Sequence, residues 1–473
     1  MAIEQAYSPY ITRTEDRLIT VMLAMMVAFS LLPSGLQWSD YAESAALAQE
    51  GSLSVKLQWG SIFAIAFYLA LRHRGLFKIQ LLAANPFMIA LVIDTALTTL
   101  WSPYPGITIK KVIQFAGIVT AAVVFQISGR SAAHFIKTTL FVLTGIEVAS
   151  VIAALVFPAQ GMDITFTNAW RGILAQKNDL GYVGALSAIL WIGLRSIEPP
   201  PLPVFLGGFG LSALCVIKST SSTSATVALV GIMTFVILFR QHVRSANWLQ
   251  RILLTLAIAI LIGVQLFFVH ESRLPTWGEV IGPFAQLFGK SADLTGRTDI
   301  WIYVIVEIEK HWLQGIGYGA FWLGPGSPSQ PILDQLPWIP FQSHNGYLDI
   351  LNELGAIGLA LFVGMILTHL VQLFRLGRYD QPLAAFHAAV LAIVCLTNMS
   401  ESSLLRGVNY PHILLMFSSV CVTSALRRYR LGIIRSPAAF ALAAPAGRRG
   451  HRLAGRAYGR AERKLQALQQ SAH

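Results

Sequence analysis

The stretch FQSHNGYLDILNELGAIGL combines a histidine and an amide with the start of a helix that is polar on one side. If a helix begins there, four polar side chains share one face of its first turns: Asn345, Asp349, Asn352 and Glu353. Such a face suits a helix whose first turns line a water-filled cavity. His344 lies just before the helix, where a neutral imidazole could accept a proton from a hydroxyl group. A capping or loop histidine is the alternative that spacing alone leaves open.

Basic residues that could bind an anion lie in other polar segments. Arg171 and Lys177 belong to NAWRGILAQKNDLG, Arg297 to LTGRTDIW, and Arg406 to NMSESSLLRG. Arginine suits phosphate because its planar fork binds two oxygens at once and stays charged. Nearby helix N-termini would add free N–H groups and a partial positive charge. These features predict a site for a polyanion such as a lipid pyrophosphate. The alternative is that these residues contact lipid headgroups or cap loops.

The elements that must position these residues are membrane helices. Of the 473 residues, 55% are hydrophobic and 12% charged, and the mean hydropathy is +0.59. A soluble domain carries about twice that charged fraction. Recurrent apolar runs are long enough to cross about 30 Å of hydrocarbon, and a helix satisfies its own backbone there. We predict an all-α polytopic membrane protein with about twelve spans, at residues 17–34, 53–71, 79–101, 108–127, 136–157, 179–196, 202–217, 223–239, 252–270, 346–373, 383–398 and 409–426.

The net charge of +12 would suit a nucleic-acid-binding protein, but the placement of the charges argues against that class. With a cytoplasmic N-terminus, most Lys and Arg residues fall in inner segments, which is the positive-inside bias. This topology divides the chain into four parts. Residues 1–270 form a membrane domain with spans 1 to 9, and 271–343 form a periplasmic loop with short helices. Residues 344–426 hold spans 10 to 12, and 427–473 form a basic cytoplasmic tail near anionic lipid.

The segment 344–358 resembles the H-[NSQ]-x9-GxxG signature of the O-antigen ligase and polymerase superfamily (WaaL/Wzy). It consists of His344-Asn345, nine further residues, and then Gly355-Ala-Ile-Gly358. Within it, the exopolysaccharide polymerases of the ExoQ type are the nearest match. LTGRTDIW, GIGYGAFW and WRGILAQKNDLG resemble further stretches of the family. The family often continues with Thr-Thr, where this chain has Leu359-Ala360, and this departure weakens the ligase interpretation. The run KSTSSTSA also lacks an Arg that the family often has. We expect the two glycines to allow close helix packing.

The resemblance, which covers roughly residues 165–410, implies a GT-C-like fold and metal-independent, inverting glycosyl transfer. The donor would be a saccharide on undecaprenyl pyrophosphate. By carry-over, Arg171 and Arg297 would hold the pyrophosphate and His344 would activate the acceptor hydroxyl. We expect four further residues to contact substrate: Lys177, Asn345, Glu353 and Arg406.

The same resemblance places the protein in the bacterial inner membrane, with a periplasmic site and cytoplasmic termini. We expect no cofactor, because no Asp-x-Asp or His/Cys cluster suggests a metal. The expected partners are the lipid-linked saccharide and the bilayer, not nucleic acid. Whether chain-length regulator and flippase proteins also bind stays open.

Two other functions also stay open. An O-antigen ligase would use the same chemistry with a lipid A-type acceptor. A polysaccharide transporter or flippase would use intramembrane charge, which Asp94 and Glu147 could supply. However, the polar segments cluster on one face and no inverted repeat is visible, whereas an alternating-access carrier binds its substrate near the midplane. We therefore expect Asp94 and Glu147 to make structural hydrogen bonds.

Overall fold

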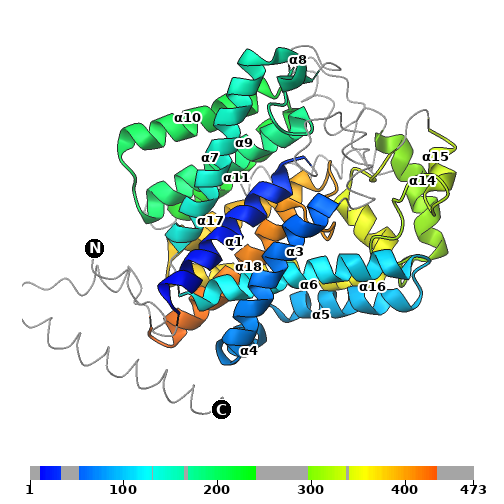
Figure 1. The fold of residues 1–473 in the computed structure, drawn as a ribbon, viewed down its shortest axis with the longest axis horizontal. Coiled ribbons are helices and arrows are strands. Elements are labelled where there is room, and N and C mark those ends of the chain that lie inside the picture. Colours follow the sequence, from blue (N-terminus) through cyan, green and yellow to red (C-terminus); the bar gives the residue numbers. More distant parts are fainter. Residues whose placement is uncertain are drawn as a thin grey trace, which may run out of the picture.

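The computed structural model describes residues 11–33, 53–129, 132–163, 169–240, 297–336 and 340–433. These residues form a bundle of helices with one two-stranded antiparallel sheet (Figure 1). The first part comprises α1 (Arg13–Leu31), α3 (Leu53–Arg72), α4 (Arg74–Ala83), α5 (Pro86–Leu97), η2 (Thr98–Leu100), α6 (Pro105–Ile127), α7 (Ala132–Val156) and α8 (Pro158–Gly161). The second comprises β1 (Met162–Asp163), β2 (Ala169–Trp170), α9 (Lys177–Ile197), α10 (Leu202–Lys218), α11 (Ser222–Arg240), α14 (Arg297–Lys310), α15 (Gln330–Leu333), α16 (Gly346–Gly377), α17 (Gln381–Thr397) and α18 (Tyr410–Arg430).

Several of these helices are long and apolar enough to cross a membrane. Within the described ranges five pass this test, namely α3, α6, α7, α9 and α16, or six if the bent pair α4 and α5 is one span. Helices α10, α11 and α17 are shorter but also apolar. The protein is therefore a mostly helical, polytopic membrane protein. Every predicted span coincides with a helix or a helix pair except 252–270, which lies outside the described residues. The number twelve stays a prediction.

The segment 79–101 differs from its prediction as one continuous span. Helices α4 and α5 meet at an angle of 101°. Pro86 has no N–H and occupies the first turn of α5, where none is needed. The Asn85 side chain caps that helix by accepting from the Phe87 N–H at 3.1 Å, and it donates to the carbonyl of Met365 at 2.9 Å. The break is therefore a defined turn between α4 and α5, and the hydrogen bond to Met365 fixes it against α16.

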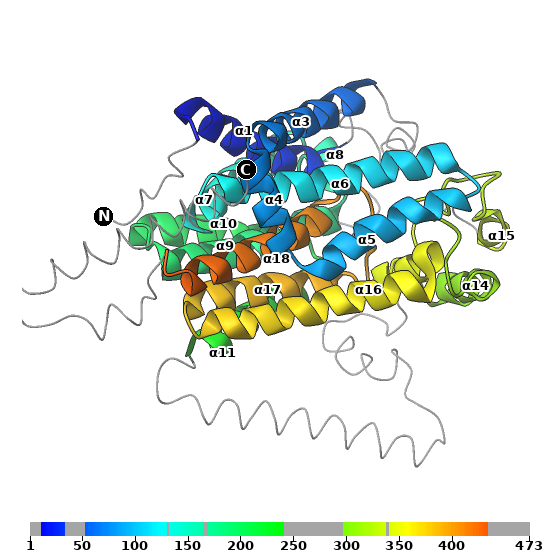
Figure 2. The same ribbon diagram turned by 90° about the horizontal axis from the view of Figure 1, so that it is seen from below.

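Helix α18 lies at the centre of the bundle, in contact with α6, α16 and α17 (Figure 2). Nearly all of its residues are buried, including several polar ones. Ser418 Oγ lies 2.9 Å from His387 Nδ1 on α17 and 3.3 Å from His369 Nε2 on α16. Because protein rather than lipid surrounds this helix, a polar side chain such as that of Ser418 finds partners on neighbouring helices. This environment accounts for the polar residues within the predicted span 409–426.

Loops from distant parts of the chain meet at one end of the bundle, which we call the site end. There α7, α10 and α17 end, and α9, α11, α16 and α18 begin (Figure 2). The Gly346 N–H at the start of α16 donates to the carbonyl of Asn398 after α17, at 2.9 Å. Helix α14 packs beside α16 over a small apolar cluster that includes Ile300, Phe321 and Trp322. The segment around His344 lies within this end.

Candidate active site

Helix α16, which carries the polar face noted in the sequence, is broken at Gly355. This residue has φ 66° and ψ −169°, outside the helical region. A second segment fills the break through four backbone hydrogen bonds: Ile316 N–H to Asn352 carbonyl (3.0 Å), Gly317 N–H to Glu353 carbonyl (3.0 Å), Ala356 N–H to Trp312 carbonyl (2.8 Å) and Ile357 N–H to Leu313 carbonyl (3.2 Å). A Cβ at position 355 would lie 2.3 Å from the Leu313 carbonyl oxygen. The expectation that Gly355 serves helix packing was therefore wrong, because its freedom of φ creates a docking point for a loop.

The docked loop continues into GIGYGAFW, whose three glycines all have positive φ. A Cβ at Gly315 would lie 2.3 Å from the backbone of Glu353, so this approach requires glycine. The Glu353 carboxylate accepts a hydrogen bond from the Gly319 N–H at 2.8 Å. Predicted to contact substrate, Glu353 thus holds the glycine segment against α16.

Arg406, also predicted to contact substrate, bridges two parts of the site end. Its Nη1 lies 3.3 Å from Oδ2 of Asp349 on α16, and its Nη2 donates to the carbonyl of Phe341. Asp349 is buried, and its Oδ1 accepts from the Trp322 indole N–H at 2.9 Å. Because breaking a largely buried pair leaves an uncompensated charge, this arrangement fixes the segment before His344 on the first turns of α16.

His344 occupies the turn that leads into α16. Its φ is +53°, a left-handed conformation that costs energy for a residue with a Cβ. Two contacts hold the turn: the Trp301 indole donates to the Ser343 carbonyl at 2.8 Å, and Ser343 Oγ donates to the Asn345 carbonyl at 2.7 Å. The Asn345 side chain is the N-cap of α16 and accepts from the Tyr347 N–H at 3.1 Å. Asn345, predicted to contact substrate, therefore has a structural partner of its own.

The imidazole of His344 faces a carboxylate that our sequence reasoning did not single out. Glu401 Oε2 lies 3.2 Å from His344 Nδ1 and accepts from Gln342 Nε2 at 3.1 Å. Its Oε1 accepts from Asn178 Nδ2, at the start of α9, at 3.3 Å. The Ser402 N–H donates to Gln342 Oε1 at 3.2 Å, which fixes the orientation of that amide. We call His344, Glu401, Gln342 and Asn178 the histidine cluster.

The geometry of the histidine cluster defines what the imidazole can do. Nδ1 lies 3.2 Å from both Glu401 Oε2 and Gln342 Nε2. When Nδ1 carries a proton that Glu401 accepts, the lone pair lies on Nε2, the tautomer that a general base needs. The side chains of His344 and Glu401 are 21% and 18% exposed, so solvent screens their interaction less than that of a surface pair. A carboxylate held by three donors can stabilise the imidazolium that forms when Nε2 takes a proton.

One sequence signal pointed toward Glu401 without identifying it. NMSESSLLRG was recognised as an unusual polar segment, but only its Arg406 was selected as a candidate. The separation of 57 residues between His344 and Glu401 carries no periodicity. Only the meeting of the loop after α17 with the turn before α16 brings the two side chains together.

The predicted pyrophosphate-binding residues come from three elements. Arg171 follows β2, where its Nε donates to the Gln160 carbonyl at 2.7 Å and its Nη1 to the Ala175 carbonyl at 3.4 Å. Lys177 is the first residue of α9, directly before Asn178 of the histidine cluster. Arg297 opens α14, and its side chain lies outside the described part of the structure. Lys177 is thus the chain neighbour of a residue of the histidine cluster, and Arg171 lies in the loop that precedes α9.

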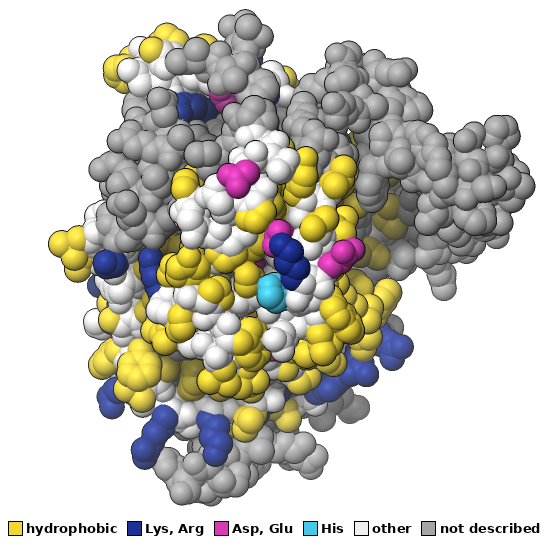
Figure 3. All heavy atoms as spheres, turned by 90° about the vertical axis from the view of Figure 1, so that its right-hand side faces the viewer, with side chains coloured by type: hydrophobic (Ala, Val, Ile, Leu, Met, Phe, Trp, Pro, Cys, Tyr) yellow, Lys and Arg dark blue, Asp and Glu magenta, His cyan; other side chains and the backbone are white. Residues whose placement is uncertain are grey.

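A further cation lies near this loop, since Lys218 Nζ at the end of α10 is 5.5 Å from the centre of the Trp170 ring. Figure 3 looks onto the side of the molecule that carries α14 and α15, where acidic, basic and histidine side chains gather amid apolar and uncharged ones. Within the described ranges no group of three His, Cys, Asp or Glu side chains could hold a metal ion. That the protein needs no cofactor stays an expectation.

The two intramembrane acids lie on different helices. Glu147, on α7, is buried and accepts a hydrogen bond from Ser212 Oγ on α10 at 3.3 Å. This contact is of the structural kind expected for Glu147. Asp94 lies half-buried on α5.

Comparison with known proteins places these features in a family context. Residues 207–363, from α10 into α16, match the O-antigen ligase family. The chain is also 25% identical over 361 residues to the "Exopolysaccharide production protein ExoQ" of Rhizobium meliloti (strain 1021), a match that covers 73% of this chain and 79% of that protein. The resemblance inferred from the His344 motif is thereby confirmed.

Proposed function

We propose that this protein polymerises oligosaccharide repeat units carried on undecaprenyl pyrophosphate, at the periplasmic face of a bacterial inner membrane, in exopolysaccharide biosynthesis. The observation that carries the proposal is the His344–Glu401 pair, at 3.2 Å, within a helical membrane protein of the ligase and polymerase class. The distant similarity to an exopolysaccharide production protein supports the polymerase. Leu359-Ala360, in place of Thr-Thr after the glycine motif, weighs against the ligase.

The proposed reaction combines the inverting transfer that the family resemblance implies with the geometry of the histidine cluster. The hydroxyl oxygen of the acceptor sugar attacks the anomeric carbon of the donor from the side opposite the pyrophosphate. The new glycosidic C–O bond forms as the bond from the anomeric carbon to the pyrophosphate oxygen breaks, so the configuration inverts. The hydroxyl proton passes to His344 Nε2, and Glu401 stabilises the resulting imidazolium.

The leaving group requires positive charge, because negative charge develops on the departing pyrophosphate. Arg171 and Arg297 supply it in this proposal, and Lys177 at the start of α9 is a third cation. A preorganised cation removes the need for solvent to reorganise during the step. Undecaprenyl pyrophosphate is the second product, and no metal ion takes part in the proposed reaction.

An O-antigen ligase is the second candidate function, because the matched family carries that description. The two functions share the histidine cluster and differ only in the acceptor. A ligase transfers the saccharide to a lipid A-type molecule, whereas a polymerase uses another lipid-linked repeat unit. The acceptor requirement therefore distinguishes them.

The test incubates purified full-length protein with its lipid-linked repeat unit in EDTA, with and without a lipid A-type acceptor, and resolves the products by size. We expect a ladder of longer lipid-linked saccharides without added acceptor. His344→Ala should abolish the ladder, and His311→Ala, a control at an exposed histidine after α14, should retain it. Product only with the lipid A-type acceptor would establish the ligase instead. Repeat units that merely cross a proteoliposome membrane would refute both enzymes in favour of a flippase.

A further inference from the structure

Helix α14 exposes a row of apolar side chains on one side. Ile302, Ile305 and Val306 are 62%, 47% and 50% exposed, and their spacing of three and four residues puts them on one face of the helix. The opposite face, which includes Ile300, packs into the apolar cluster beside α16. Large apolar side chains that stay exposed in a contiguous row are typical of a surface that binds a membrane or another protein. We call Ile302, Ile305 and Val306 the α14 face.

The part of α16 after its break indicates where the membrane lies. Between Glu353 and Arg375 the sequence contains no Asp, Glu, Lys or Arg. From Gly355 to Phe374 the helix would rise about 30 Å, at about 1.5 Å per residue, which is the thickness of the hydrocarbon core. One boundary of the hydrocarbon therefore lies near Gly355, and the polar first turns of α16 lie outside it.

The segment that follows α14 is joined to α16 at this boundary. The carbonyls of Trp312 and Leu313 accept hydrogen bonds from the N–H groups of Ala356 and Ile357, at 2.8 and 3.2 Å. Leu313 and Ile357 are both exposed, so the exposed apolar surface of α16 passes directly to the segment after α14. Trp312 is 59% exposed, and an exposed tryptophan at this level is typical of the aromatic belt of a membrane protein.

The direction of α14 agrees with a position at the membrane surface. The helix lies across the end of α16 rather than along it (Figures 1 and 2), so its whole length stays near the boundary at Gly355. Trp101, which follows η2 and is also exposed, donates its indole N–H to the Gly315 carbonyl at 3.1 Å. A second exposed tryptophan thus lies close to the same boundary. An amphipathic helix in this position turns its apolar face toward the acyl chains.

We propose that α14 is an interfacial helix whose apolar face binds the lipid surface of the membrane that α16 crosses. Glu309 and Lys310, the exposed charges among its described side chains, are adjacent and of opposite sign. Burial of apolar surface, rather than attraction to anionic lipid, therefore holds the helix.

The other side of α14 connects this lipid contact to the histidine cluster. The Trp301 indole donates to the Ser343 carbonyl at 2.8 Å, in the turn that carries His344. A helix held at the membrane surface thereby fixes the position of that turn. The lipid contact does not depend on the proposed function, whereas its effect on His344 rests on it.

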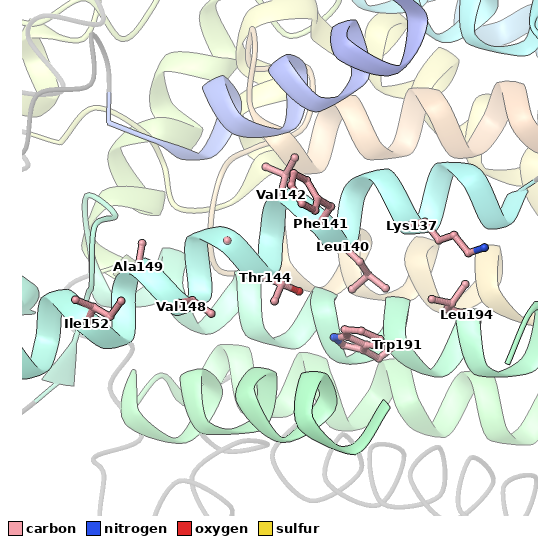
Figure 4. A pocket seen from close by; sticks show the side chains of 11 residues that line it. Lys137, Leu140, Phe141, Val142, Thr144, Val148, Ala149, Ile152, Trp191 and Leu194 are labelled. Carbon is pink, nitrogen blue, oxygen red and sulfur yellow. The ribbon is translucent and has the colours of Figure 1, made fainter. Parts of the chain in front are cut away.

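Photolabelling of the full chain in phosphatidylcholine nanodiscs tests the lipid contact without requiring turnover. One phosphatidylcholine probe carries a diazirine close to its glycerol, and a second carries it at the end of an acyl chain. We expect the first probe to label residues 302–313. The second should label the apolar groove of α7, which has a volume of about 800 Å³ and is lined by Phe141, Val148 and Ile152 (Figure 4). Labelling of α14 should be the same with added phosphatidylglycerol and at high salt.

Two variants separate the lipid contact from its effect on the site. Ile305→Glu should reduce labelling of α14 about tenfold, because burying an isoleucine among acyl chains contributes at least that factor. Gln335→Glu, which adds the same charge at an exposed position after α15, is the matched control and should not. Trp301→Phe should leave labelling unchanged and lower kcat about two- to twelvefold with KM unchanged, the range that one net hydrogen bond represents. Ile305→Glu should lower kcat by no more, and the double variant should lose no more than Trp301→Phe alone.

Label in the α7 groove without label on α14 would overturn the proposal, because another surface would then cover the α14 face. So would capture of residues 241–296, or of a second protein, by a photo-reactive phenylalanine analogue in place of Ile305. Labelling that requires anionic lipid would refute apolar burial as the driving force. Label on α14 with an unchanged kcat in Ile305→Glu would refute the connection to His344. Label on α14 without any saccharide ladder would leave the lipid contact standing and refute the polymerase.

Discussion

The pairing of His344 with Glu401 leads to a quantitative prediction for Glu401→Gln. Glutamine keeps the shape of the side chain and one acceptor oxygen, but it removes the negative charge 3.2 Å from His344 Nδ1. A hydrogen bond to a charged group contributes about 1.5–3 kcal/mol. At about 1.4 kcal/mol per factor of ten, kcat should fall by about 10- to 150-fold. KM should change little, because the imidazolium forms only as the acceptor proton is transferred.

The assay is the rate of ladder formation in single-turnover and steady-state conditions, with two comparison variants. Glu401→Asp should restore part of kcat, because it returns the charge on a shorter side chain. Glu309→Gln, an exposed residue on α14, should behave as the unsubstituted protein. Unfolding temperature, measured in parallel, separates a folding defect from a catalytic one.

A wild-type kcat in Glu401→Gln would refute the proposed role of the carboxylate. A rise in KM with unchanged kcat would place Glu401 in substrate binding rather than in positioning the histidine.

Two further predictions concern the framework of the site. Gly355→Ala should lower the free energy of unfolding by roughly 2–5 kcal/mol, because a positive φ costs about 1–2 kcal/mol in a residue with a Cβ and the loop must move away from a Cβ that would lie 2.3 Å from it. Thermal unfolding measures this loss, with Gly60→Ala at an exposed glycine of α3 as the control. A loss no larger than that of the control would contradict the docking role of Gly355. Asp349→Asn should lower the free energy of unfolding by about 1–3 kcal/mol, because it weakens a charged hydrogen bond to Arg406, whose side chain is 29% exposed. An unchanged unfolding temperature together with unchanged activity would show that this ion pair is unnecessary.

The apolar runs were sufficient to predict the helices of the membrane domain. Residues 346–373 and 383–398 coincide with α16 and α17, because a segment of that length and hydropathy has few other stable states in lipid. The corner at Asn85-Pro86 was missed, since the hydropathy of 79–101 continues across it. The sequence does contain a proline and an N-cap residue at this point. The same two residues also occur at a mild kink within one span, so they do not by themselves predict a sharp turn between two helices.

The predicted site residues have different surroundings in the structure. His344 lies in a built cluster, but Asn345 caps a helix, and Glu353 and Arg406 hold neighbouring segments. The roles of all seven predicted site residues in catalysis or substrate binding stay proposals. Helical spacing correctly placed Asp349, Asn352 and Glu353 on the first turns of α16, but it could not indicate that the facing surface is another part of the chain.

The sequence by itself determined the membrane class, the helix positions and the motif around His344. These depend on local composition and on spacing within one helix, which act over a few residues. Tertiary structure alone decided that Glu401 faces His344 and that Gly355 admits a loop. Each of these depends on contacts between segments far apart in the chain, for which packing of the whole bundle, rather than any local preference, selects the partner.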